Sequence, residues 1–374
     1  MLDTTVAPKD ALASVSDIVS WFGRIPVFSA SLRLTKECEA RCPYCYSSSA
    51  RRMPHELTRD EVLQVVDQIC ELGAIRLFLS GGEPTRVPHL AEVVERAARR
   101  SVRVAVSTHG YTGNDDLICD LDAAGLSQFQ LSLDARGELH DQIRGLPGLY
   151  ERAIETLRRA NALFGPEVDV IVATVVTRAN VTEVPGLLAD AARAGARSFA
   201  VVPLVVTGRA KPSLAIGISE LMAVIGTLAR MSISNPAGPR LRVLLPPALV
   251  PAVSGGDGYV HSYPFELAVD ANGDVALTDL GLNPPRRIIG NVRSHALADI
   301  YEGAVLAEAG ALPQNRAEMT GVCRSCAHWD ICGGGNRLLA QKSDGSDPFC
   351  QAAFEAGLFP PSALLRYPEG ENRP

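Results

Sequence analysis

Seven of the nine cysteines fall into two groups whose spacing is typical of metal ligands. The first group is Cys38, Cys42 and Cys45, in the order C-x3-C-x2-C. Three thiolates on one loop can bind three irons of a [4Fe–4S] cluster and leave the fourth iron without a protein ligand. A structural zinc site would need a fourth ligand, because such sites are closed. We therefore expect an iron–sulfur cluster with one open position.

The second group, Cys323, Cys326, Cys332 and Cys350, supplies four thiolates. This number fits either a zinc site or a fully ligated iron–sulfur cluster, and the spacing leaves both open. The odd cysteine count and the absence of an apolar secretion signal argue against disulfides, so we expect a reducing, cytoplasmic location. Cys70 and Cys119 lie in predicted helices, where we expect buried structural thiols.

Strands and helices alternate around the first cysteine group. The predicted strands are 27–35, 75–80, 102–108, 128–134, 168–176 and 198–206, and the predicted helices are 56–73, 89–100, 115–124, 148–163 and 182–194. Thr58 and Glu61 are spaced as a capping box at the start of the first of these helices. Six such units imply a parallel sheet or partial barrel covered by helices. In such sheets the chemistry lies at the carboxyl ends of the strands.

The pattern changes after Gly208. We expect a helix at 217–230, a strand at 241–245, a hairpin at 265–279 turning at Asn272-Gly273, and a short helix near 295–303. A weakly amphipathic helix is also expected near 10–22. The predicted domains are an N-terminal extension (1–27), a (β/α)6 core (28–212), a linker with one helix (213–260), a small α+β domain (261–360) and a tail (361–374).

Composition limits the partners. The 374 residues are 47% hydrophobic and carry a net charge of -6, which indicates a globular protein and argues against a nucleic-acid binder. No apolar stretch reaches the ~20 residues that span a bilayer, so we expect no membrane segment.

Further motifs end the predicted strands and carry a resemblance to a known family. Gly81-Gly82-Glu83-Pro84 ends the second strand, and Ser107-Thr108-His109-Gly110 ends the third. Ser132-Leu-Asp134 ends the fourth, with His140-Asp141 and Arg144-Gly145 close behind. With the cysteine triplet, these residues resemble the radical S-adenosylmethionine (SAM) superfamily over residues 28–210. The third motif is similar to that family's Ser-Thr-Asn-Gly.

The resemblance implies a mechanism and a cofactor site. The open iron would bind the amino and carboxylate groups of SAM, and one electron would cleave SAM to methionine and a 5'-deoxyadenosyl radical that abstracts hydrogen from a C–H bond. Tyr44 would lie against the adenine, Ser132 and Asp134 near the ribose, and Arg144 against the carboxylate. The strand end at Gly81, Gly82 and Glu83 would meet the methionine amine. The implied SAM-binding residues are Tyr44, Gly81, Gly82, Glu83, Ser107, Ser132, Asp134 and Arg144.

The second cysteine group resembles the SPASM extension of many radical SAM enzymes, which carries auxiliary [4Fe–4S] clusters. Gly333-Gly334-Gly335 follows Cys332, and Asp347-Pro348-Phe349 precedes Cys350. Two cysteines of the fuller pattern are missing, since Asn336 and Thr278 occupy their positions. We therefore expect one auxiliary cluster and two [4Fe–4S] clusters in all, with a zinc site as the alternative for the second group.

The resemblance also bears on substrate and partners. It favours modification of a ribosomally made peptide by crosslinking, epimerisation or oxidation in natural-product maturation. Alternatives are a tetrapyrrole side chain, an aminoglycoside-type sugar, or a non-catalytic iron–sulfur redox sensor. A flavodoxin or ferredoxin is the expected electron donor. Because only 37 residues precede Cys38, we expect a leader-peptide-binding domain to be a separate protein or absent.

Acid–base candidates are Tyr263, Glu266 and Asp279, around the predicted hairpin. Their alternative interpretation is that of ordinary surface polar residues.

Overall fold

The structure is a computed structural model of the whole chain. It describes residues 27–110, 114–250, 266–283, 286–311, 316–335 and 344–365, together with positions 25, 313 and 339. The expected helix near 10–22 and the candidate Tyr263 lie outside the described residues.

One ten-stranded sheet organises the fold, in the order β10-β9-β8-β1-β2-β3-β4-β5-β6-β7. Strands β1 to β8 form parallel pairs, whereas β9 and β10 are antiparallel additions at one edge. The strands are β1 (Ser29–Thr35), β2 (Arg76–Gly81), β3 (Arg103–Thr108), β4 (Gln128–Ser132), β5 (Asp169–Val176), β6 (Ser198–Pro203), β7 (Arg240–Val243), β8 (Glu266–Val269), β9 (Asp274–Ala276) and β10 (Gly290–Asn291). The predicted α/β class with a partial barrel is confirmed.

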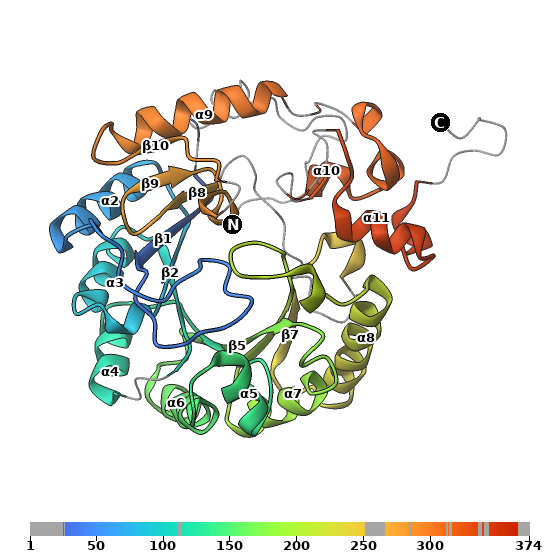
Figure 1. Cartoon of the computed structure of the whole chain (residues 1–374), viewed down its shortest axis with the longest axis horizontal. Coiled ribbons are helices and arrows are strands. Elements are labelled where there is room, and N and C mark those ends of the chain that lie inside the picture. The colour runs from blue at the N-terminus through green and yellow to red at the C-terminus, as the bar shows by residue number, and fades with distance from the viewer. Residues whose placement is uncertain are drawn as a thin grey trace.

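Helices α2 to α8 surround the strands, as Figure 1 shows, and α9 to α11 follow in the last third of the chain. The helices are α2 (Arg59–Glu71), α3 (Leu90–Ala98), α4 (Asp115–Ala123), α5 (Gly137–Arg144), α6 (Leu149–Leu163), α7 (Val184–Arg193), α8 (Ile218–Ser234), α9 (Leu297–Ala311), α10 (Trp329–Cys332) and α11 (Pro348–Glu355). The predicted capping box at Thr58 and Glu61 is confirmed at the start of α2.

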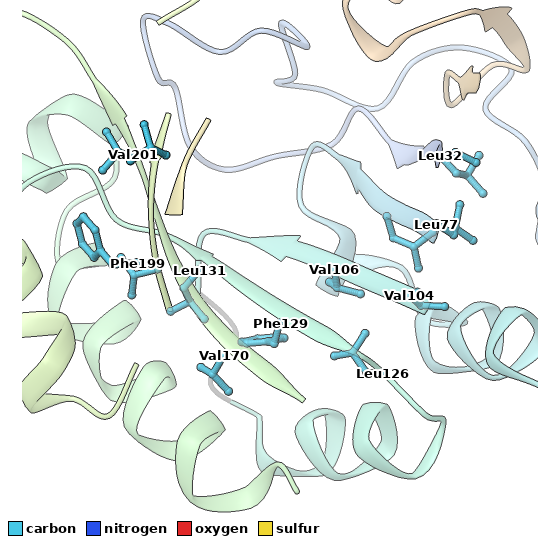
Figure 2. Close-up of a cluster of buried hydrophobic side chains, with 14 of the residues drawn as sticks. Leu32, Leu77, Val104, Val106, Leu126, Phe129, Leu131, Val170, Phe199 and Val201 are labelled. Atoms are coloured by element: carbon cyan, nitrogen blue, oxygen red, sulfur yellow. The ribbon is translucent and has the colours of Figure 1, made fainter. Parts of the chain in front are cut away.

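The core lies between the sheet and its helices. Alternate strand residues such as Leu32, Leu77, Phe129 and Val170 point to the helix side and are fully or almost fully buried (Figure 2). The residues between them face the inside of the curved sheet, and several of these are polar. The first β strand illustrates this, because Arg33 lies between Leu32 and Leu34. The inside of the barrel is therefore polar along β1 and apolar where Ile171, Ala173 and Ala200 of β5 and β6 cluster.

The predicted hairpin around Asn272-Gly273 is confirmed, but it does not stand apart from the core. Strand β8 pairs in parallel with β1, with Ser29 beside Glu266 and Leu32 beside Val269. At the other edge β7, which falls in the expected linker, pairs with β6. The sheet thus runs through the predicted boundaries, and the division into domains stays a prediction.

Two smaller expectations can be compared with the structure. Cys70 is partly buried against the core, whereas Cys119 is exposed on α4, so the expectation of a buried thiol was wrong for Cys119. The nine-residue α4 buries Ile118 and Leu121 and packs Leu117 partly against the core, whereas Cys119 is exposed. Among the described helices, none combines the length and the apolar character needed to cross a membrane.

Candidate functional site

The first cysteine group lies on a loop that leaves β1 and closes on itself. The amide of Ala50 donates to the carbonyl of Lys36 at 2.9 Å, and the amide of Cys38 donates to the carbonyl of Ala50 at 3.2 Å. Burial raises the pKa of the Cys42 thiol, Arg144 opposes the rise, and the nearby Cys38 and Cys45 add to it. Three neighbouring thiols on one loop, one of them buried, fit a site completed by a bound cation, such as iron.

Two glycines at the end of β2 let the cysteine loop pack closely. A Cβ atom at Gly81 would lie 2.3 Å from the carbonyl oxygen of Thr35, and one at Gly82 would lie 2.0 Å from that of Glu37. The amide of Gly82 donates to Thr35 at 2.7 Å, so the strand end is bonded to the start of the loop. Gly81 and Gly82 therefore let the end of β2 approach the backbone of the loop that carries the cysteines.

Glu83 is fully buried and organises the end of β3. Its Oε2 accepts from the backbone amide of His109 at 2.9 Å and lies 3.1 Å from His109 Nε2. Its Oε1 accepts from the hydroxyl of Thr85 at 2.8 Å. The carboxylate of Glu83 is thus engaged by protein groups.

His109 connects this carboxylate to the cysteine loop. Ligand atoms of Cys38, Glu39 and His109 lie within 4.8 Å of one another. Burial lowers the pKa of His109, but Glu83, Cys38 and Glu39 overcome this effect and raise it to about 10. The hydrogen bond with His109 lowers the pKa of Glu39 to about 2. From the sequence alone we assigned no function to His109. The signal that could have identified it is that His109 stands where the family's Ser-Thr-Asn-Gly motif has asparagine.

Asp134 and Arg144, predicted SAM contacts, meet at the end of β4. Arg144 Nη2 pairs with Asp134 Oδ2, to which the hydroxyl of Tyr44 also donates. The guanidinium carbon of Arg144 lies 5.8 Å from the centre of the Tyr44 ring. Arg144 Nη1 lies 3.7 Å from the Sγ of Cys42. We call Tyr44, Asp134 and Arg144 the Asp134 cluster.

The remaining predicted SAM contacts lie on the same edge of the sheet. Ser107 ends β3 and accepts from Gln130 Nε2 at 3.3 Å, and Ser132 ends β4 beside Ala173. The structure therefore brings Tyr44, the Gly81–Glu83 segment and both serines to the carboxyl ends of the first four strands. Their contacts to SAM stay predictions.

The second cysteine group surrounds a hollow in the last third of the chain. All four cysteines line it, together with residues of the adjoining turns that include His328, Trp329 and Asp347. Burial raises the pKa of Cys332 to about 12, and Cys323 and Asp347 contribute. Burial also raises the pKa of Cys350. Four crowded thiols, of which Cys332 is partly and the others fully buried, fit a site closed by a metal ion or cluster, and both zinc and iron satisfy this arrangement.

The two described acid–base candidates of the hairpin, Glu266 and Asp279, lie in different surroundings. Glu266 lies beside Ser29, at the amino end of β1, about 20 Å along the strand from the cysteine loop. It adds to the rise that burial causes in the pKa of Tyr301. Asp279 lies on the inside of the barrel and binds Arg33. Thr278, at the position of a missing cysteine, accepts a hydrogen bond from the amide of Gly281 at 3.3 Å.

Sequence reasoning missed a buried charge network around Arg33. This side chain is fully buried, and its Nε donates to Asp279 Oδ1 at 2.9 Å. Asp270 lies 3.6 Å from the Arg33 guanidinium and 3.1 Å from Lys36 Nζ. The ring of Tyr46, the residue after Cys45, lies 5.1 Å from the guanidinium carbon. An arginine between two leucines of a predicted strand was the only local signal.

The chain is similar to known proteins in sequence and in fold. The family model described as the radical SAM superfamily matches residues 32–189. The chain is 29% identical over 338 residues to the mycofactocin maturase MftC of Mycobacterium ulcerans, covering 86% of this chain and 87% of that protein. It is 26% identical over 340 residues to the AdoMet-dependent heme synthase of Methanosarcina barkeri, covering 85% and 94%. The structure of Streptococcus suis SuiB bound to precursor peptide SuiA superposes with a TM-score of 0.69 at 15% identity, covering 89% and 78%.

Proposed function

We propose that this chain, which belongs to the radical SAM superfamily, modifies a ribosomally made peptide during the maturation of a natural product. In this family an iron–sulfur cluster reduces SAM to give a 5'-deoxyadenosyl radical, which removes hydrogen from an unactivated C–H bond. The observation that carries the assignment is the loop of Cys38, Cys42 and Cys45, packed against Gly81 and Gly82 at the carboxyl ends of β1 and β2.

The chain's own residues divide the work. Cys38, Cys42 and Cys45 would hold the SAM-binding cluster, and the backbone after Gly81 would meet the methionine amine. Ser107, Ser132 and Asp134 line the next strand ends. Arg144 has a buried Nε without a hydrogen-bond partner among the described residues, which supports a contact with the SAM carboxylate. The protein thus supplies orientation and exclusion of water, while the cofactors supply the radical chemistry.

We further propose one auxiliary [4Fe–4S] cluster at Cys323, Cys326, Cys332 and Cys350. The proposal is supported by four cysteines around one hollow and by the absence of a cysteine at Thr278. Four protein ligands leave no iron open to substrate, so this cluster would relay electrons or support the fold.

The partners follow from the chemistry. A flavodoxin or ferredoxin would supply electrons, and the peptide would be the substrate partner. All nine cysteines are free of disulfides, which is compatible with a reducing compartment.

The peptide assignment rests on the similarity to a maturase over most of both chains, together with the fold shared with SuiB. A tetrapyrrole is the second candidate, because the heme synthase similarity also covers most of both chains.

A substrate assay separates the two candidates. The reconstituted, reduced protein is incubated with SAM and either a precursor peptide encoded beside its gene or a tetrapyrrole with propionate side chains. Mass spectrometry then follows substrate and 5'-deoxyadenosine. A peptide mass change in proportion to 5'-deoxyadenosine supports the proposal. Turnover of the tetrapyrrole with an unchanged peptide refutes it in favour of the second candidate.

A further inference from the structure

Arg144 contacts a cluster ligand as well as lying at the expected SAM site. Its Nη1 lies 3.7 Å from the Sγ of Cys42, and both side chains are buried. Cys45 differs, since its Sγ meets the neutral hydroxyl of Ser47 at 3.4 Å, whereas Cys38 lies beside His109. A cationic N–H donor therefore faces Cys42.

The position of Arg144 is fixed from several sides. Asp134 pairs with Nη2, and the Tyr44 ring lies against the guanidinium. The carbonyl of Arg144 accepts from the amide of Arg41, within the cysteine loop, at 2.7 Å. Asp134 is itself fixed, because its Oδ1 accepts from the amide of Val175 at 2.8 Å. The guanidinium is thus held against Cys42 by the fold and needs no bound SAM for this contact.

We propose that Arg144 is a positioning residue that sets the reduction potential of the SAM-binding cluster through Cys42, in addition to any contact with SAM. The inference rests on the proposed cluster at Cys38, Cys42 and Cys45.

Electrostatics gives the direction of the effect. Reduction adds one negative charge to the cluster and its thiolates, and a buried cation beside one sulfur stabilises that charge. Hydrogen bonds to ligand sulfurs are among the factors that set cluster potentials. Arg144 therefore raises the potential, which makes the cluster easier to reduce. Asp134 holds the arginine, but its own negative charge acts in the opposite direction.

The test is a redox titration of the reconstituted full-length protein without SAM, monitored by electron paramagnetic resonance. The signal to follow is assigned in the wild type as the one that SAM perturbs. Arg144→Gln is expected to shift its midpoint to more negative potential, and Arg144→Lys to a value between the two. Arg136→Gln is the matched control and leaves the midpoint unchanged. Arg136 lies at the start of α5 and forms a half-exposed ion pair with Asp190.

Asp134→Asn supplies the opposite prediction. It removes a negative charge near Cys42 and is expected to shift the midpoint to more positive potential. If Arg144→Gln prevents iron incorporation, Arg144→Lys decides: a shift of the midpoint to more negative potential supports the inference, and an unchanged or more positive midpoint overturns it.

The outcomes also separate the inference from the proposed function. A role for Arg144 only toward SAM predicts weaker SAM binding with an unchanged SAM-free midpoint, and this result overturns the inference. Wild-type protein that binds no iron at the first cysteine group overturns the proposed function as well.

Discussion

At the scale of single residues, the inside of the barrel is held by buried charges whose partners are distant in the chain. Arg33 on β1 binds Asp279 and Asn283, which lie about 250 residues later. Asp270 bridges Arg33 and Lys36. These contacts fix the segment after β9 against the strand that leads into the cysteine loop. The network therefore couples the late part of the chain to the site of chemistry.

Replacing Arg33 tests this coupling. Arg33→Met retains much of the side-chain volume but leaves Asp279 without its cation, and removal of one partner of a buried ion pair costs about 3–5 kcal/mol. We expect the midpoint of chemical denaturation to fall accordingly. The matched control Arg136→Met breaks a half-exposed pair with Asp190 and should cost about 1 kcal/mol or less.

A second variant identifies the cause. Adding Asp279→Asn to Arg33→Met removes the uncompensated carboxylate, so the double variant should regain part of the lost stability. A double variant no more stable than Arg33→Met would show that lost packing, not unpaired charge, explains the effect.

At the scale of elements, the cysteine loop depends on a close approach between the end of β2 and the residues after β1. Gly82 has no space for a side chain, because the obstructing atoms belong to the backbone of Lys36 and Glu37. Any Cβ there must displace the start of the loop. The chemistry of the loop is thus set by a neighbouring strand as much as by its own sequence.

Gly82→Ala is expected to displace the loop and prevent the first cluster from assembling. Reconstituted protein should then retain about four irons of the eight expected for two clusters. Gly303→Ala on α9, where an added Cβ meets nothing within 4 Å, is the control and should bind as much iron as the wild type. Full iron incorporation in Gly82→Ala would contradict this account of the loop.

Elements and motifs differed in how far the sequence could predict them. The strands before Cys38 and Gly81, the capping box at Thr58 and the turn at Asn272-Gly273 depend on local chemistry and were predicted. The parallel pairing of β8 with β1 joins segments about 240 residues apart, and the alternation of polar and apolar residues does not specify a partner. The same limit applies to the Arg33 network and to the contact of Arg144 with Cys42, 102 residues earlier.

At the scale of the whole molecule, the two cysteine sites lie in different parts of one fold. The first lies beyond β1, and the second surrounds a hollow between η6 (Gly321–Ser325), α10 and α11. Helix α11 also packs against α8 of the barrel, which links the second site to the core. The two cysteine sites are therefore separate within one fold.

If the two cysteine sites bind metal independently, removing the cysteines of one site should leave the metal of the other in place. Combined replacement of Cys332 and Cys350 by Ala should remove about four irons and leave the signal of the SAM-binding cluster in place. Elemental analysis of iron and zinc with a sulfide assay makes the comparison. Loss of about one zinc with no loss of iron would assign the second site to zinc and withdraw the electron relay. Loss of all metal would contradict the independence of the sites.

The central claim is that the loop of Cys38, Cys42 and Cys45 supports reductive cleavage of SAM, and the most direct test is the formation of 5'-deoxyadenosine. The anaerobically reconstituted protein is reduced with dithionite, supplied with SAM and analysed by liquid chromatography and mass spectrometry. We predict 5'-deoxyadenosine and methionine from the wild type and neither from a variant with all three cysteines replaced by Ala. Iron-loaded wild-type protein that forms no 5'-deoxyadenosine, or equal formation by the variant, would contradict the account.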